Sequence, residues 1–327
     1  MLKKIVLLAF LLLGLLHLQA QRVDYSVVSV QEEKGIDFVQ ITTSGDYVHM
    51  PVVKRSWKKV DWSSNRVLDI SVDGKNIAYL SSRNNTTNIF IKELSKQGSS
   101  IQRTNRSEVL DFSFSPDGKY ICFSEKRGNT TQIFQTDAEN GYVCRQITSG
   151  SRDNSPIYTP DMQQIFFSRL EKKGVSIWSY NIQDNFLSTY TSGMNSYPIP
   201  DTTSSFICAR ISVEGRSEIW KINYETGIEE CLISDRERNF TSPVLSPDGK
   251  WILFVGSTKI TSPRTYFNTD IFVAQIDGIN FHQITYHAAD DLSPVWSKDG
   301  KYIYFISQRG SLEGAANIWR MNFNFGD

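Results

Sequence analysis

Two histidines of this chain lie close to carboxylates, a combination that suits metal binding. His287 is followed by Asp290 and Asp291, and His49 is preceded by Asp46. Two imidazoles with one or two carboxylates can hold Zn²⁺ or a similar ion if the fold brings the two segments together. The usual spacings of zinc-binding histidines are absent, and Asp290 and Asp291 also suit a turn. We therefore expect no cofactor, with a metal site at these five residues as the alternative.

Motifs for covalent and nucleotide chemistry are absent from the sequence. It contains no Gly-x-Ser-x-Gly, no P-loop, no His-Glu-x-x-His, no paired Cys-x-x-Cys and no Gly-x-Gly-x-x-Gly. A serine nucleophile would need a base such as His49 or His287 beside it, and no local pattern marks such a serine. The sequence therefore predicts a protein that is not an enzyme.

The elements that must position these residues are marked by a recurring turn with the pattern Ser-x-Asp-Gly-Lys, followed each time by an apolar strand. Clear copies lie at 71–75, 115–119, 246–250 and 297–301, and weaker copies at 158–162 and 198–202. Proline in the second position presets φ, aspartate bonds forward to the backbone, and glycine accepts the left-handed conformation. Each copy therefore reverses two antiparallel strands, and the chain contains six such hairpins.

A second pattern counts the same units. An isoleucine followed by a large aromatic residue comes after each turn, at positions 89, 133, 177, 219, 271 and 318. A further strand follows in five units but not in the last, whereas residues 38–42 near the N-terminus have the form of that missing strand. Repeats of this length are typical of propellers, and an N-terminal strand in the last blade closes the ring without open edges.

We therefore predict an all-β fold, a six-bladed β-propeller of four-stranded antiparallel blades, closed by strand 38–42 in the last blade. Residues 22–327 form this single domain. The predicted blades lie approximately at 67–105, 106–150, 151–193, 194–235, 236–288 and 289–325.

The four cysteines fall on this pattern without forming pairs. Cys122 and Cys208 fall on second strands of the second and fourth blades, and Cys144 and Cys231 on fourth strands of the same blades. The third strand separates them, so at roughly 4.8 Å per strand their Cα atoms lie about 10 Å apart, beyond disulfide reach. We expect four unpaired thiols, mostly buried.

Residues 1–21 have the form of a secretory signal peptide. Lys3 and Lys4 precede an apolar run at 5–16, and Ala20 offers a small residue for cleavage. The run is short for a membrane span, and no second apolar stretch follows it. We expect an exported, soluble monomer, periplasmic or extracellular, with no integral membrane segment after signal removal.

Bulk charge gives no sign of a nucleic-acid partner. Thirty-five lysines and arginines balance 35 aspartates and glutamates, and removal of the signal leaves a net charge of about −2. Residues 53–62 interleave basic and aromatic side chains, but without overall basic charge we interpret them as a solvated hairpin. No nucleic acid is expected as a partner.

The Ser-x-Asp-Gly-Lys turns and their apolar strands, with Gln-Ile-Thr segments between blades, resemble the repeats of the TolB-like propeller family over most of residues 38–325. The resemblance implies a ring that binds partners, and it implies no reaction. Relatives of this kind include the periplasmic TolB of the Tol–Pal system and the propellers that precede peptidase domains in prolyl oligopeptidase-like enzymes. From the lengths on either side of the repeats, we expect neither the N-terminal domain of TolB nor a hydrolase domain.

We predict a binding face at the loops that enter each blade. Its candidate contact residues are Arg152, Asp153, Arg236, Arg238, Asp290 and Asp291. Loops between second and third strands lie on the same face and add the cations Arg83, Lys126, Arg127, Lys172, Lys173, Arg216, Lys259, Arg264 and Arg309. Such a face would attract an anionic partner, either a protein or a cell-envelope component. The alternative is that these are ordinary solvated charges offset by nearby acids.

Together these patterns predict an exported, non-catalytic propeller that binds a protein or a cell-envelope component through its loop face. The alternative is a carbohydrate-binding or carbohydrate-cleaving propeller, because sites are grafted onto this fold without changing it. Two carboxylates at glycosidase separation would favour the alternative, whereas exposed aromatic residues on a flat face would favour protein binding.

Overall fold

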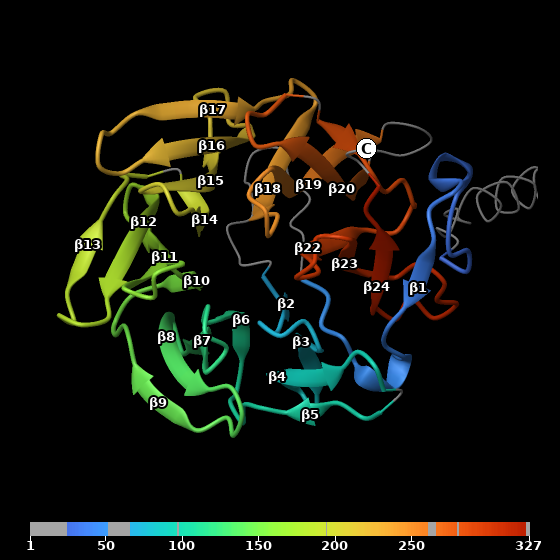
Figure 1. Cartoon of the computed structure of the whole chain (residues 1–327), viewed down its shortest axis with the longest axis horizontal. Helices are drawn as coiled ribbons and strands as arrows, with labels where there is room; N and C mark the ends of the chain where they lie inside the picture. The colour runs from blue at the N-terminus through green and yellow to red at the C-terminus, as the bar shows by residue number, and fades with distance from the viewer. Residues whose placement is uncertain are drawn as a thin grey trace, which may run out of the picture.

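The computed structural model describes residues 25–51, 66–96, 98–193, 195–260, 266–279 and 281–324. Residues 1–21, 53–62 and Arg264 lie outside these ranges, and the side chains of Cys144 and Lys259 are also not described. No helix in the described ranges is both long and apolar enough to cross a membrane. The described strands form six four-stranded sheets around a common axis (Figure 1). The prediction of a six-bladed propeller with antiparallel blades is therefore confirmed.

Each blade runs outward from the axis in strand order. Blade 1 contains β2 (Leu68–Ile70), β3 (Asn76–Arg83), β4 (Thr86–Glu93) and β5 (Ile101–Gln102). Blade 2 contains β6 (Val109–Phe114), β7 (Tyr120–Arg127), β8 (Thr130–Asp137) and β9 (Val143–Gln146). Blade 3 contains β10 (Asp153–Tyr158), β11 (Gln164–Glu171), β12 (Gly174–Asn181) and β13 (Leu187–Thr189). Blade 4 contains β14 (Asn195–Pro200), β15 (Ser205–Ile211), β16 (Ser217–Asn223) and β17 (Glu229–Ile233). Blade 5 contains β18 (Arg238–Leu245), β19 (Trp251–Ile260), β20 (Tyr266–Gln275) and β21 (His282–Gln283). Blade 6 contains β22 (Asp291–Trp296), β23 (Tyr302–Ser307), β24 (Asn317–Asn322) and the N-terminal strand β1 (Phe38–Gln40).

The N-terminal strand closes the ring, as predicted. β1 pairs antiparallel with β24, with Gln40 opposite Trp319, and the ladder continues through a hydrogen bond from the Ile41 N–H to the Ile318 carbonyl (2.8 Å). Two short 3₁₀ helices, η1 (Gln31–Glu33) and η2 (Ser44–Asp46), flank β1. The strand covers an edge of blade 6 that would otherwise be open to pairing with another chain.

The recurring turn is held by its own serine and aspartate. In blade 2, the Ser115 hydroxyl donates to Asp117 (2.6 Å), the Lys119 N–H donates to the same carboxylate, and Gly118 has φ 75°. The equivalent serine-to-aspartate bonds recur in blades 1, 5 and 6, and a threonine replaces the serine in blade 3. The sequence repeat thus produces one local structure because each copy satisfies its own polar groups.

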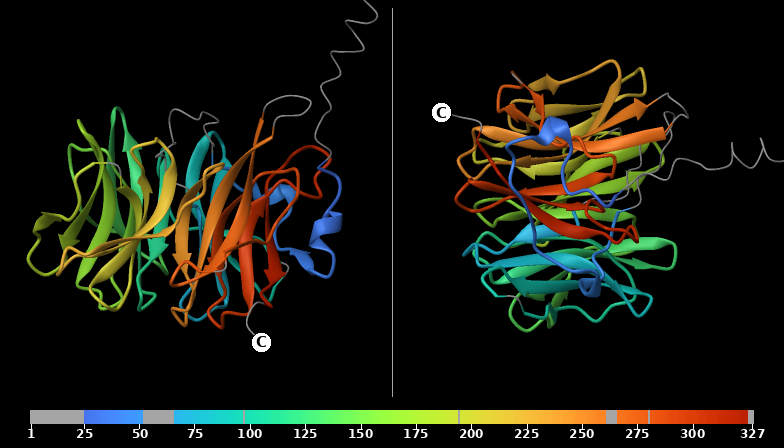
Figure 2. Two further views of the ribbon diagram at one scale, coloured as in Figure 1. Left: turned by 90° about the horizontal axis from the view of Figure 1, so that it is seen from above. Right: turned by 90° about the vertical axis from the view of Figure 1, so that its right-hand side faces the viewer.

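The hydrophobic core lies between neighbouring blades, since each blade is a single sheet that must bury both of its faces. Fully buried side chains on the second strands include Ile77, Ile121, Ile165, Phe206, Ile252 and Ile303. Within a blade, aromatic rings of the third strand stack on rings of the second strand, for example Phe134 on Phe123 and Phe272 on Phe254, each with centroids 5.7 Å apart. The edge-on view in Figure 2 shows the loops gathered at the two faces of the ring.

The thiols of Cys122, Cys208 and Cys231 are unpaired. Burial raises the pKa of Cys122 and of Cys208 to about 12, which keeps both thiols protonated and inert. Cys231 is exposed because it lies on the outermost strand of blade 4.

Candidate functional site

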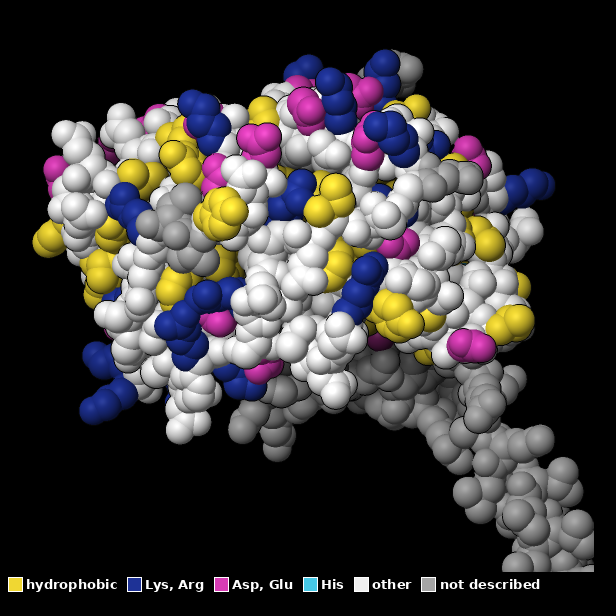
Figure 3. Space-filling model, turned by 90° about the horizontal axis from the view of Figure 1, so that it is seen from below, with side chains coloured by type: hydrophobic (Ala, Val, Ile, Leu, Met, Phe, Trp, Pro, Cys, Tyr) yellow, Lys and Arg dark blue, Asp and Glu magenta, His cyan; other side chains and the backbone are white. Residues whose placement is uncertain are grey.

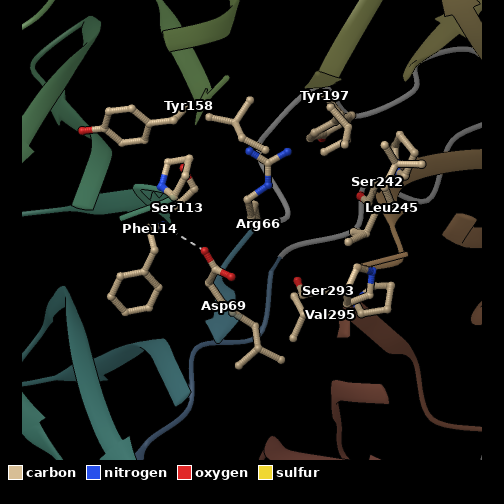
Figure 4. A pocket seen from close by; sticks show the side chains of 18 of the residues that line it. Arg66, Asp69, Ser113, Phe114, Tyr158, Tyr197, Ser242, Leu245, Ser293 and Val295 are labelled. Carbon is tan, nitrogen blue, oxygen red and sulfur yellow. Dashed lines mark hydrogen bonds between the residues drawn. The ribbon is translucent and has the colours of Figure 1, made fainter. Parts of the chain in front are cut away.

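The six innermost strands surround a pocket of about 520 Å³ on the axis of the ring. Its lining includes residues of the recurring turns, among them Val72, Pro116 and Pro247, so the pocket reaches the surface where those turns lie. We call this surface the turn face, and the opposite surface, formed by the loops that enter each blade and the loops between second and third strands, the entry-loop face. Figure 4 shows side chains from several blades converging on the pocket.

A repeated backbone distortion shapes the pocket wall. In blades 3 to 6 the innermost strand has a register shift at a residue that precedes proline and has a positive φ of 52° to 54°. These residues are Ser155, Tyr197, Ser242 and Ser293. Proline supplies no N–H to the ladder, and a bulge re-aims the strand, so the wall turns carbonyl and proline groups toward the axis.

Arg66 crosses the axis at the end of the pocket remote from the turns. Its guanidinium donates to the carbonyls of Pro156 in blade 3 (3.1 Å) and Pro198 in blade 4 (3.4 Å), and it lies between the blades in Figure 4. Burial lowers the pKa of Arg66, and the nearby carboxylates of Asp69 and Asp111 partly offset this effect. Arg66 therefore forms a polar floor for a pocket that is open toward the turns.

Asp69 supplies a carboxylate to the pocket wall. It accepts hydrogen bonds from the backbone N–H groups of Phe114 (2.9 Å) and Ile70 (2.8 Å). Burial raises the pKa of Asp69, and the charge of Lys298 at the pocket mouth acts in the opposite direction. Asp69 is the single carboxylate among the described lining residues, and the other walls are largely apolar, with Phe114, Tyr158 and Val295.

Two grooves extend the pocket mouth across the turn face. A groove of about 330 Å³ between blades 5 and 6 shares Pro247 and Lys298 with the pocket. Its aromatic wall is fixed by edge-to-face contacts of Phe323 with Trp296 (centroids 4.6 Å apart) and with Trp251 (5.4 Å). A second groove, of about 480 Å³ between blades 1 and 2, shares Val72 and Phe114 with the pocket.

The residues predicted to form the binding face lie elsewhere, and none of them lines the pocket. Arg152 and Arg236 are exposed on the entry-loop face. Arg238 is half-buried and pairs with Asp235 (3.1 Å). Asp290 accepts hydrogen bonds from the backbone N–H (3.1 Å) and the hydroxyl (2.8 Å) of Thr269, so it ties the entry loop of blade 6 to β20 of blade 5.

Two of the predicted contact residues are buried, and their assignment to a contact surface is corrected. Asp153 is fully buried because both of its oxygens accept from the guanidinium of Arg169, at 2.7 and 2.9 Å. Asp291 is fully buried against Arg309, with 2.6 Å between Oδ2 and Nη2. Charged groups that are desolvated and paired hold the fold together and offer no surface to a partner.

Some of the predicted loop cations stack on aromatic rings. The guanidinium of Arg83 lies over the ring of Phe90 (4.3 Å) and that of Arg127 over Phe134 (4.4 Å). Arg169, which the sequence did not single out, stacks in the same way on Trp178 (4.5 Å). Ion pairs accompany this stacking: Arg127 with Glu125, Lys126 with Glu108, and Arg216 with Glu214. These ion pairs neutralise part of the positive charge expected on this face, whereas Lys172 and Lys173 are exposed.

Arg309 corrects the prediction most clearly, because it is fully buried. Its guanidinium pairs with Asp291 and with Glu33 (3.0 Å) and lies over the ring of Phe38 (4.2 Å). Burial alone would lower the pKa of Arg309, but the two carboxylates outweigh it and raise the pKa. Burial, together with the charge of Asp291, also raises the pKa of the neighbouring Asp270 to about 9.

The proposed metal ligands are engaged in separate hydrogen-bond networks. The Nδ1 of His287 accepts from the Ala289 N–H (2.9 Å), and its Nε2 lies 3.1 Å from the Val27 carbonyl. His49 instead contacts Ser82 (2.7 Å), and Asp46 accepts hydrogen bonds that tie it to blade 1. Within the described residues, no three His, Cys, Asp or Glu side chains have the geometry of a metal site. The alternative of a metal site at ring closure gains no support.

Comparisons with known proteins agree with the architecture. Residues 63–202 match the family model of the TolB beta propeller domain, PD40. A putative TolB from Agrobacterium tumefaciens has a similar structure, with a TM-score of 0.60, 17% identity, and coverage of 88% of this chain and 98% of that chain. TolB from Acinetobacter baumannii matches with a TM-score of 0.57 and 20% identity over 73% of this chain and 58% of that chain. The predicted resemblance to TolB-like propellers is confirmed.

An enzyme is also among the similar structures. The oligogalacturonate lyase from Vibrio parahaemolyticus matches with a TM-score of 0.58 and 11% identity, over 90% of this chain and 96% of that chain. At such identities the likeness concerns the fold alone, and function must be argued from the site.

Proposed function

We propose that this chain, whose residues 63–202 match the TolB beta propeller domain, is an exported, non-catalytic propeller that binds a segment of another cell-envelope protein in its turn-face pocket. One observation carries the proposal: a pocket of about 520 Å³, built from all six blades, that continues into two grooves. Its location moves the expected interaction from the entry-loop face to the turn face.

The shape and lining of this surface suit an extended peptide. A pocket of this volume accepts one or two side chains, since ligand pockets span about 300 to 1,000 Å³. The groove between blades 5 and 6 would receive the chain on one side of the pocket, where Trp251 and Phe323 offer apolar contact. Lys298 is exposed at the junction of pocket and groove and favours a segment with an acidic residue there.

The carbohydrate-cleaving alternative finds less support in the pocket. Glycoside hydrolysis by the common mechanism needs two carboxylates that face each other across the bond. Asp69 is the single carboxylate among the described lining residues, and backbone N–H groups already occupy both of its oxygens. A pocket of this kind favours binding over cleavage.

Capture from the native cell envelope tests the proposal. The mature protein is used as bait, and each captured partner is then measured against purified variants by calorimetry. Val72→Arg places a long side chain at the mouth, where Val72 is 41% exposed, and should weaken partner binding at least about tenfold, or 1.4 kcal/mol. Lys298→Glu should weaken it by a similar factor.

The matched control lies on the other face. Arg152→Glu reverses an exposed charge at the entry loops and should leave affinity within about twofold. The proposal fails if Arg152→Glu abolishes binding while Val72→Arg and Lys298→Glu bind like the unchanged protein.

A further inference from the structure

A second cleft lies on the outer side of the ring, away from the turn-face pocket. It has a volume of about 880 Å³ and lies between the closing strand β1 and the outer part of blade 1. In Figure 1 the chain passes from β1 through η2 to the rim of blade 1, beside β4 and β5. We call this space the closure cleft, because one of its walls is the segment that closes the propeller.

The closure cleft has an excess of positive charge. Arg83, Lys92, Lys96 and Arg320 line it, against the carboxylates of Asp46 and Glu93. Lys96 pairs with Glu93 at 2.8 Å, whereas Asp46 is shared between Lys92 and Arg83, at 3.6 Å from each.

Arg320 completes this excess. It stacks on the ring of Tyr302 (4.5 Å) and shares a hydrogen bond with the Tyr304 hydroxyl, and its Nε is buried without a hydrogen-bond partner. The described lining therefore has four cations against two carboxylates, and Arg320 has no ion pair with either carboxylate.

Asp46 makes this wall rigid. Its carboxylate accepts hydrogen bonds from Ser100 (2.5 Å), Tyr79 (3.0 Å) and the Thr43 N–H (3.0 Å). Burial alone would raise the pKa of Asp46, but these bonds and the charge of Lys92 outweigh it, so the pKa lies below its ordinary value. The carboxylate stays ionised and fixes Lys92 in place, which leaves a preformed cationic wall.

The remaining lining is rich in small polar groups. Its exposed residues include Gln40, Thr43, Ser95 and Ser99, together with backbone at Gly45 and Gly98. Hydroxyls and amides at this density match a ligand that carries many hydroxyl groups, whereas a phosphate or a single carboxylate would use the cations alone.

We propose that the closure cleft binds an acidic oligosaccharide, with ring carboxylates on Arg320 and Lys92 and ring hydroxyls on the polar lining. The cleft is distinct from the turn-face pocket, so the inference stands whether or not that pocket binds a protein. A volume of about 880 Å³ accommodates two to three sugar rings, within the range of small-molecule sites.

Calorimetric titration of the mature protein with trigalacturonate tests this inference, with cellotriose as the neutral probe and hexaglutamate as the acidic peptide probe. Trigalacturonate should bind with a salt-sensitive affinity at least about tenfold above that of cellotriose. Arg320→Gln should weaken trigalacturonate binding about tenfold and lower the melting temperature only slightly, through the lost stacking on Tyr302, and Lys92→Gln should weaken binding in the same direction.

Lys119→Gln is the matched control, because Lys119 is an exposed lysine of a turn in blade 2, outside the cleft. It should leave trigalacturonate affinity unchanged. Equal trigalacturonate affinity in Arg320→Gln and the unchanged protein overturns the proposal even if Lys92→Gln fails to fold. Tighter binding of hexaglutamate than of trigalacturonate, or no binding of trigalacturonate, overturns it as well.

Discussion

The two faces of the ring come from the same six repeats but use their charged residues in opposite ways. On the turn face, each aspartate is bonded within its own turn, and the lysine that follows extends into solvent, as at Lys119 and Lys250. On the entry-loop face, arginines stack on aromatic rings and pair with acids. In the view of Figure 3, positive and negative side chains are interspersed along the upper edge of the molecule.

This difference in the use of charged residues indicates which face is available to a partner. Turns that satisfy their own polar groups leave the axial pocket open between them. Arginines that are stacked and paired contribute to stability, and their positive charge is largely cancelled before a partner arrives. The number of cations in a set of loops is therefore a poor guide to the field they produce.

The largest effect is expected from removal of the N-terminal segment, which supplies β1 to blade 6 and Glu33 to the buried charge cluster at the entry-loop face. A chain that begins at Gly45 lacks β1 and Glu33, so blade 6 has three strands and a bare edge. We expect aggregation or an early melting transition. Size-exclusion chromatography and thermal melting, compared with a chain that begins at Tyr25, check this. A monomer with an unchanged melting temperature would show that β1 is dispensable for closure.

The buried charge cluster should produce the next largest effect. Arg309→Met keeps the volume near Phe38 but leaves Glu33 and Asp291 buried without their cation, which should lower the free energy of unfolding by about 3 to 5 kcal/mol. Denaturant titration measures the loss. Arg152→Met, at an exposed position, is the control and should change stability by less than about 0.5 kcal/mol. Equal stability of the two variants would contradict the structural role of Arg309.

The two faces should also respond to pH in opposite directions. The hydrogen bond from Ser246 lowers the pKa of Asp248, and Ser297 does the same for Asp299. Such groups add stability above the unfolded pKa of 3.8, and this stability is lost as pH falls through their folded pKa. The buried Asp270, with its pKa raised to about 9, instead loses its contribution as pH rises from 3.8 to about 9.

Asp270→Asn separates the two effects. It removes the ionisable group from the entry-loop face and should stabilise the protein at pH 8 by at least about 1.4 kcal/mol, the equivalent of one pKa unit. Denaturant titrations at pH 5 and pH 8 measure the change. Asp248→Asn should shift stability the other way, and identical pH profiles for both variants would refute the assignment of opposite signs.

The fold could be predicted from the sequence because its signals are local or repeated. Each turn reverses the chain through residues within five positions of one another, as in 115–119. Strand 38–42 could be identified because five of the six units have a fourth strand and the last unit lacks one. The pairing of β1 with β24 supplies this missing strand.

The candidate site could not be predicted in the same way. Arg66 meets the carbonyls of Pro156 and Pro198 across 90 and 132 residues, and no spacing marks those contacts. A usable signal did exist at the pocket mouth. Val72 and Lys298 replace the proline of the recurring turn, and both line the pocket.

The smallest predicted effect compares one cation from each face. Arg127 is on the entry-loop face, stacked on Phe134 and paired with Glu125 at 3.0 Å, and Arg127→Gln should lower the free energy of unfolding by about 1 kcal/mol. Lys119 extends from its turn with 3.7 Å to Asp117, and Lys119→Gln should stay within about 0.3 kcal/mol of the unchanged protein. Parallel denaturant titrations at low and high salt compare the two variants. The loss in Arg127→Gln should persist at high salt, because stacking of the guanidinium side chain is screened less than exposed charge. If Lys119→Gln were less stable than Arg127→Gln, the conclusion that cations of the entry-loop face contribute more to stability than lysines of the turn face would be wrong.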